Sequence, residues 1–129
     1  VMALAAAGGS PETLYVGSPG SGVLKSTDGG KTWTPASNGL VTPTVYTLAV
    51  DPVTRQTVYA GIDGGLYRST DAGVTWRKLA FPGSHAVAVA VSPSDPNVIV
   101  AIAVRVISPT EQQGLVYRSE DGGVTWIGR

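Results

Sequence analysis

The stretch STDGGKTW at residues 26–33 decides the fold of this chain, because the chain contains it three times. It recurs as STDAGVTW at residues 69–76 and as SEDGGVTW at residues 119–126. From one copy to the next, the final tryptophan is repeated after 43 residues and then after 50 residues. A repeat with a period of about 20–50 residues indicates a chain assembled from stacked copies of one supersecondary unit.

The similarity between the copies extends upstream of each eight-residue box. The segment VMALAAAGGSPETLYVG at 1–17 aligns without gaps on VYTLAVDPVTRQTVYAG at 45–61, and AVAVAVSPSDPNVIVAI at 86–102 follows the same template. Apolar and β-branched residues stand at successive positions in these segments, which is typical of strands covered on both faces. Each unit is therefore predicted to hold two apolar strands, a short third strand, the box and a short fourth strand. The predicted units are residues 1–44, 45–85 and 86–129.

A period of about 40–50 residues with four strands per unit is typical of β-propeller blades. No segment shows the sustained 3.6-residue periodicity of an amphipathic helix. The sequence therefore predicts an all-β fold, a partial β-propeller of three four-stranded antiparallel blades. In each blade the box forms the hairpin between the third and fourth strands.

Each box has a physical interpretation as a tight turn. Its aspartate is expected to accept hydrogen bonds from backbone N–H groups, and its glycine to supply a positive φ. Its tryptophan is expected to bury the indole against the blade. D-x-G spacing is also found in calcium loops, but the boxes lack the terminal glutamate, so no metal site is predicted. The residues given this structural role are Asp28, Gly30, Trp33, Asp71, Gly73, Trp76, Asp121, Gly123 and Trp126.

These boxes resemble the Asp-box, also called the BNR repeat. That repeat is found in sialidases, xyloglucan-degrading glycoside hydrolases, sortilin-type receptors and photosystem II assembly factors. The resemblance covers essentially the whole chain and implies a propeller fold. It does not specify an activity, because enzymes, receptors and assembly factors share this fold.

Composition excludes several classes of partner. Nine basic and nine acidic residues give a net charge of zero, and the basic residues are dispersed, which argues against nucleic-acid binding. No apolar run reaches the roughly 18–20 residues that membrane insertion requires. The chain has no cysteine, so disulfides and thiolate chemistry are excluded, and the sequence indicates no cofactor.

The sequence predicts no catalytic residues. Glycoside hydrolysis requires two facing carboxylates, and no pair stands out among the acidic residues outside the key box positions. The sialidase Arg-Ile-Pro signature is absent. His85 is the only histidine, which argues against a catalytic triad or a histidine-rich metal site. Lys25, Arg68 and Arg118 precede the boxes at equivalent positions and are interpreted as blade-surface residues.

One insertion breaks the repeat. The third unit carries nine additional residues between its second and third strands, around 104–114. By propeller geometry this insertion is predicted to lie on the face opposite the boxes, together with His85 and the loop 38–43. Loops on a rigid scaffold often carry function, although a tolerated surface insertion is the alternative. The candidate ligand-binding residues on this face are His85, Arg105, Glu111, Gln112 and Gln113.

The sequence therefore favours a non-catalytic binding or assembly module of a larger extracytoplasmic protein, extracellular or periplasmic. The alternative is a fragment of a glycoside hydrolase of the sialidase or xyloglucanase type. Three blades are fewer than the roughly 4–8 with which propellers close. The expected partners are further blades of a longer chain, a second copy or another protein covering the exposed blade faces, with carbohydrate as a candidate ligand. The first is favoured, because the chain begins at Val1 rather than at a methionine.

Overall fold

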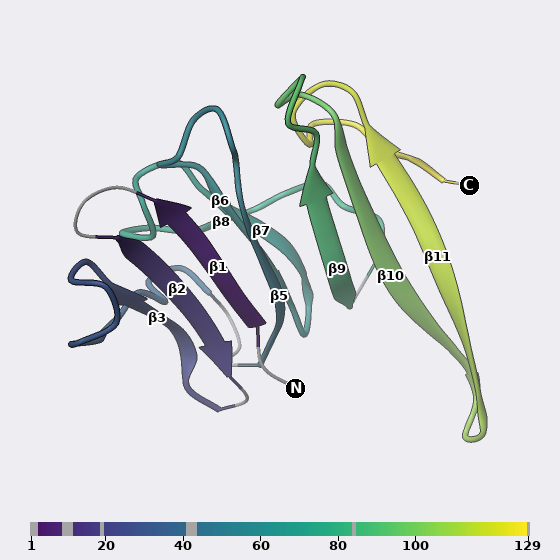
Figure 1. Cartoon of the computed structure of the whole chain (residues 1–129). Coiled ribbons are helices and arrows are strands. Elements are labelled where there is room, and N and C mark those ends of the chain that lie inside the picture. Colours follow the sequence, from purple (N-terminus) through teal and green to yellow (C-terminus); the bar gives the residue numbers. More distant parts are fainter. Residues whose placement is uncertain (1–2, 9–11, 19, 41–43, 84, 129) are drawn as a thin grey trace.

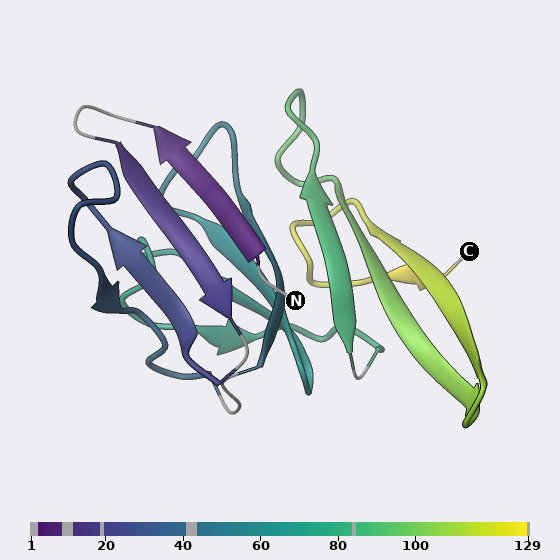
Figure 2. The same ribbon diagram turned by 60° about the horizontal axis from the view of Figure 1, so that its bottom comes forward.

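A computed structural model describes residues 3–8, 12–18, 20–40, 44–83 and 85–128. Within these ranges the protein is all-β and forms three four-stranded antiparallel sheets, which stand beside one another as blades (Figures 1 and 2). The predicted fold class is confirmed. The described residues contain no helix that could cross a membrane.

The strands of each blade follow one another in chain order, so every blade is a meander. The first blade contains β1 (Ala3–Gly8), β2 (Thr13–Ser18), β3 (Gly22–Ser26) and β4 (Thr34–Pro35). The second contains β5 (Val45–Val50), β6 (Val58–Ile62), β7 (Gly65–Ser69) and β8 (Arg77–Lys78). The third contains β9 (Ala86–Val91), β10 (Ile99–Ser108), β11 (Glu111–Ser119) and β12 (Ile127–Gly128).

The additional residues of the third unit form strand. The ladder between β10 and β11 continues without interruption from Ile99 opposite Ser119 to Val106 opposite Gln112, and it closes at Ser108 opposite Glu111. The insertion therefore lengthens a hairpin, which projects beyond the other strands in Figure 1. Backbone hydrogen bonding along the ladder gives these residues a regular structure instead of an irregular loop.

Each box is a compact network of polar contacts. Asp28 Oδ1 accepts hydrogen bonds from the backbone N–H of Lys31 at 3.0 Å and of Thr32 at 2.9 Å. The buried Ser26 hydroxyl donates to the same oxygen at 2.8 Å and accepts from Gly30 N at 2.9 Å. The serine–aspartate–threonine contacts repeat in the second and third boxes. The same serine–aspartate–threonine network therefore ends the third strand of each blade.

The network holds two consecutive residues in the left-handed conformation. The box glycines Gly30, Gly73 and Gly123 have φ values of 96°, 87° and 92°. The residue before each of them is left-handed as well, including Ala72 with φ 59°. A non-glycine residue pays a steric penalty in this region. The hydrogen bonds of the second box thus hold a conformation that Ala72 alone disfavours.

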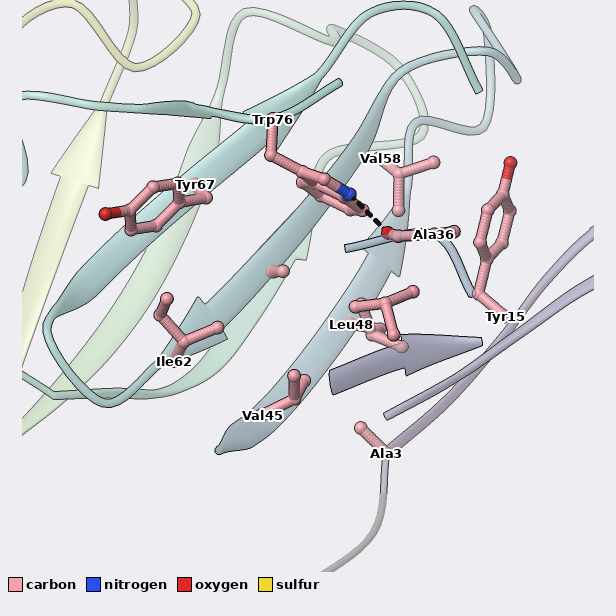
Figure 3. Close-up of a cluster of buried hydrophobic side chains, with 11 residues drawn as sticks. Ala3, Tyr15, Ala36, Val45, Leu48, Val58, Ile62, Tyr67 and Trp76 are labelled. Atoms are coloured by element: carbon pink, nitrogen blue, oxygen red, sulfur yellow. Dashed lines mark hydrogen bonds between the residues drawn. The ribbon is translucent and has the colours of Figure 1, made fainter. Parts of the chain in front are cut away.

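Adjacent blades pack face to face, and cross-strand neighbours define which residues share a face. The face of the first blade that meets the second carries Tyr15 and Val23, and the opposing face of the second carries Leu48, Ala60 and Trp76. These side chains form one buried cluster (Figure 3). A second cluster between the second and third blades contains Leu66, Phe81, Ala86, Ala101 and Ala103.

Burial of the box tryptophans depends on the preceding blade. Trp76 is only 4% exposed, and its Nε1–H donates to the carbonyl of Ala36 in the first blade at 2.7 Å (Figure 3). Trp126 is half-buried, with its ring 5.1 Å from that of Phe81 in the second blade. Trp33, which follows no described blade, is 37% exposed. The prediction that every box indole is buried is therefore wrong for Trp33, because the neighbouring blade provides the cover.

We expect Trp76→Ala to lower the free energy of unfolding by about 3–5 kcal/mol, as large-to-small changes at buried aromatics do. Trp33→Ala is the matched control, and it should lower the same quantity by only about 1–2 kcal/mol because its ring is partly in water. Urea unfolding followed by far-ultraviolet circular dichroism measures both values. Equal losses for the two variants would contradict this account of tryptophan burial.

The lowered pKa values of the box aspartates predict that the stability of the fold depends on pH. In Asp28, Asp71 and Asp121 the pKa is lowered from 3.8 to about 2, first by the hydrogen bond from the box threonine hydroxyl and then by backbone N–H donors. A carboxylate whose pKa is lower in the folded chain than in the unfolded chain stabilises the fold at pH values above its unfolded pKa. That contribution is lost as the pH falls from about 4 through about 2.

Replacing all three box aspartates by asparagine should flatten the fall in melting temperature between about pH 4 and about pH 2, because the replaced groups no longer titrate. Thermal melts at half-unit pH intervals measure the slope. The control is Glu111→Gln, at an exposed carboxylate on the long hairpin. An unchanged slope in the triple variant would show that the box carboxylates do not govern the acid response.

Candidate functional site

The first blade has one uncovered face. We call the side of a blade toward the preceding blade its leading face, and the side toward the next blade its trailing face. Leu4 on the leading face of the first blade is 69% exposed, whereas Leu48, at the equivalent position of the second blade, is 8% exposed. Trp33 of the first blade is exposed as well, whereas the equivalent Trp76 of the second blade is buried.

The third blade has the complementary uncovered face. Val116 on its trailing face is 38% exposed, whereas the equivalent Val23 and Leu66 of the earlier blades are fully buried. Val100 is 36% exposed, whereas the equivalent Tyr59 is buried. The described arc thus ends in an apolar leading face on one side and an apolar trailing face on the other.

A repeated polar contact joins neighbouring blades. Lys25, directly before the first box, donates from Nζ to the carbonyl of Ala72 in the second box at 2.7 Å. Arg68, directly before the second box, donates from Nη1 to the carbonyl of Gly122 in the third box at 2.7 Å. Each acceptor is the left-handed residue that follows the box aspartate. A cation of one blade therefore binds the box of the next.

Tyrosines flank these cations on the trailing faces. The ring of Tyr15 lies 5.8 Å from Lys25 Nζ, within the range of a cation–π contact. Burial raises the pKa of Tyr15. Burial also raises the pKa of Tyr59, although the hydrogen bond and charge of Arg68 oppose the shift. The cations therefore lie in partly desolvated junctions, where a charge-assisted hydrogen bond is stronger than in water.

Arg118 is the third member of this series, at the trailing end of the arc. Its Nε lies 3.3 Å from Glu120 Oε1 but makes no hydrogen bond. The interpretation of Lys25 and Arg68 as simple surface residues missed their role between blades. The signal in the sequence was the repetition of a cation directly before every box.

Two open hollows lie beside the polar contacts between blades. One, of about 540 Å³, is lined by Lys25, Asn38 and Ala72 among others. The other, of about 520 Å³, is lined by Arg68, Asp71 and Arg77 among others. The first hollow is lined by residues of the first and second blades, whereas the second is lined by residues of the second blade alone.

The predicted ligand-binding residues lie at the base and along the length of the long hairpin. His85 forms an isolated bridge with Asp63, its Nδ1 is 2.9 Å from the Asp63 carboxylate, and its carbonyl accepts from Val104 N. Arg105 of β10 stands opposite Gln113 of β11. Glu111, Gln112 and Gln113 are exposed and follow one another along β11. Successive strand residues alternate between faces, so these three do not converge on one point.

Asn38, which begins the loop 38–43, is not placed as expected. The carbonyl of Asn38 accepts a hydrogen bond at 2.9 Å from the backbone N–H of Trp76, which ends the second box. Asn38 therefore lies beside a box and not on the opposite face, because the chain leaving the first blade crosses the junction there. Residues 41–43 lie outside the described residues.

Two acidic side chains outside the boxes, Asp51 and Asp95, make local contacts. The buried Asp51 accepts from Val53 N at 2.8 Å and caps a turn, and Asp95 accepts from Asn97 N at 3.0 Å. Within the described ranges, no three histidine, cysteine or acidic side chains gather in a way that would hold a metal ion. These contacts hold turns between strands, which is a structural use of the carboxylates.

Comparison with known proteins places these features in a family. The Sortilin-Vps10 family profile, described as sortilin, neurotensin receptor 3, matches residues 21–128. Xyloglucanase Xgh74A of Acetivibrio thermocellus is 35% identical over an alignment of 133 residues, gaps included. The alignment covers 81% of this chain and 15% of that enzyme. A probable oligoxyloglucan-reducing end-specific xyloglucanase of Neosartorya fischeri is 37% identical over 79 residues, covering 54% of this chain and 9% of that protein. The chain thus spans a small part of these curated relatives.

Solved structures share the fold. An ancestral GH74 enzyme superposes with a TM-score of 0.77 at 24% identity, covering 90% of this chain and 16% of that one. YCF48 bound to D1 peptide superposes with a TM-score of 0.71 at 16% identity, covering 98% of this chain and 39% of that one. With the repeated boxes and the family match over most of its length, the chain belongs to the Sortilin-Vps10 family of Asp-box β-propellers.

Proposed function

We propose that this chain is a non-catalytic binding or assembly segment of an Asp-box propeller, whose two uncovered faces dock against further blades or another protein. The observation that carries the proposal is the contrast between equivalent positions. Leu4 is exposed where Leu48 is buried, and Val116 is exposed where Val23 and Leu66 are buried. Covering one such side chain stabilises a complex by about 1.5–3 kcal/mol, so both faces favour a partner.

The length of the relatives supports further blades as those partners. The chain covers 9% and 15% of two related xyloglucanases, and propellers close with about 4–8 blades. Carbohydrate remains a candidate ligand at the long hairpin, with His85, Arg105, Glu111, Gln112 and Gln113 as its proposed contacts. An extracellular or periplasmic location also stays a prediction.

A second candidate function is that of a glycoside hydrolase fragment of the xyloglucanase type. The observation that favours it is the 35% identity with Xgh74A over 81% of this chain. Hydrolysis requires an acid and a facing carboxylate. Asp51 and Asp95 hold turns, and Glu120 lies beside Arg118, so the acids of such an enzyme would have to come largely from other blades.

We expect the purified chain to release no reducing sugar from xyloglucan and no sialic acid from a sialoside above the protein-free rate, because its described acids Asp51, Asp95 and Glu120 are engaged in local contacts. Product quantification by chromatography measures this, with an active xyloglucanase as the positive control. Turnover that disappears in Asp63→Asn or Glu111→Gln would overturn the non-catalytic proposal in favour of the hydrolase.

A further inference from the structure

We propose that the junction between the first two blades binds a sulfate or phosphate group, held by Tyr15, Lys25 and Arg55 around a hollow of about 200 Å³. The residues that line this hollow come from the first and second blades, which pack against each other within the described arc. The site therefore does not depend on what covers the end faces, and it goes beyond the docking function proposed above.

One wall of the hollow is a buried tyrosine with an unsatisfied hydroxyl. Tyr15 is fully buried, and among the described residues its hydroxyl has no hydrogen-bond partner. In Figure 3 this hydroxyl points away from the other labelled side chains of the apolar cluster. The equivalent Tyr59 of the second blade differs, because Arg68 makes a hydrogen bond with it. A buried hydroxyl without a partner lowers stability, so a ligand oxygen that accepts from Tyr15 would recover that loss.

Two cations line the same hollow and have donors to spare. Lys25 Nζ donates to the carbonyl of Ala72 at 2.7 Å, which leaves two of the three ammonium donors. Arg55 is exposed and makes no hydrogen bond or ion pair with any described residue. Its Nη1 lies beside the first blade, because a Cβ added at Gly8 would be only 3.0 Å away. Pro96 stands at the equivalent position of the third unit, so this cation is absent from the junction between the second and third blades.

The surplus of donors identifies the ligand as an anion. The other described residues that line the hollow are neutral: Ala7, Gly8, Thr13, Gln56 and Ala72. Two carboxylates, those of Glu12 and Asp51, line the neighbouring hollow instead. Asp51 is committed there to the backbone N–H groups of its own turn. Positive charge with unused donors and no acidic side chain in the described lining favours an oxyanion.

The origin of the three donor groups indicates the shape of that anion. Tyr15 belongs to β2, Lys25 to β3, and Arg55 to the turn that follows β5. Donors from three separate segments suit an anion whose oxygens point in several directions, as in sulfate and phosphate, better than a planar carboxylate. The volume agrees, because about 200 Å³ exceeds the roughly 30 Å³ of one water but is below the roughly 300 Å³ of pockets for drug-sized ligands.

Nuclear magnetic resonance titration of the isotope-labelled full chain at constant ionic strength tests the proposal. Inorganic phosphate and sodium sulfate should each shift amide signals around Gly8 and Ala72, and sodium acetate should bind at least several-fold more weakly. Arg55→Gln should raise the dissociation constant for phosphate about tenfold or more, because a charge-assisted hydrogen bond is lost. Lys31→Gln, at an exposed cation outside the hollow, is the charge-matched control and should change nothing. The ratio of the affinities for methyl phosphate and inorganic phosphate distinguishes an ester from the free ion.

Thermal melts of two tyrosine variants make the test independent of Arg55. Without phosphate, Tyr15→Phe should keep or raise the melting temperature, because it removes a hydroxyl that has no partner. With saturating phosphate it should melt below the parent, since the ligand loses a donor. Tyr59→Phe is the matched control, and it should lower the melting temperature under both conditions because its hydroxyl is bonded to Arg68.

Three results would overturn the proposed anion site. The first is the absence of localised amide shifts with both phosphate and sulfate. The second is an affinity for phosphate that neither Arg55→Gln nor Tyr15→Phe reduces, or one that acetate equals. The third is a Tyr15→Phe variant that is destabilised equally with and without phosphate, which would show that ordered water already satisfies the hydroxyl.

Discussion

The serine–aspartate network of the Asp-box is the interaction on which the rest of this structure depends. A buried serine hydroxyl and one carboxylate together satisfy the backbone N–H groups of a turn with two consecutive left-handed residues. The network ends the third strand of every blade at the same point and starts the fourth in the same direction. It also directs the carbonyl of the first left-handed residue toward the preceding blade, where it receives the cation of that blade. One local turn therefore fixes the hairpin between the third and fourth strands of a blade and the polar contact between blades.

Burial in this protein is a property of pairs of blades. The same leucine, valine or tryptophan position is buried or exposed according to whether a neighbour covers it. A blade is a thin sheet with two apolar faces, and it has no interior of its own to protect them. A partial arc is thus a fold with uncovered apolar faces, and the proposed function follows from those faces more than from any cluster of reactive side chains.

The family relationship agrees with this division between scaffold and function. The chain is 35% identical to xyloglucanase Xgh74A, and it shares its fold with an ancestral GH74 enzyme and with YCF48. The activity of a propeller depends on the groups that its loops present. In this chain the largest departure from the repeat is the long hairpin of the third blade. Its ladder carries a register shift between Val106 and Ser108, and it presents Glu111, Gln112 and Gln113 on a strand beside that shift.

The sequence by itself determined the blades, the strand order and the box turns. These depend on residues within a few positions of one another, such as Ser26, Asp28 and Gly30, and on a repeat that is visible in the letters. It indicated neither the exposure of Trp33 nor the contacts of Lys25 and Arg68, and it placed Asn38 on the wrong face. Those features depend on groups 38–54 residues apart that stacking brings together. Only the tertiary structure decided them, because the neighbour that covers a face is set by how the blades stack and not by the residues of the face.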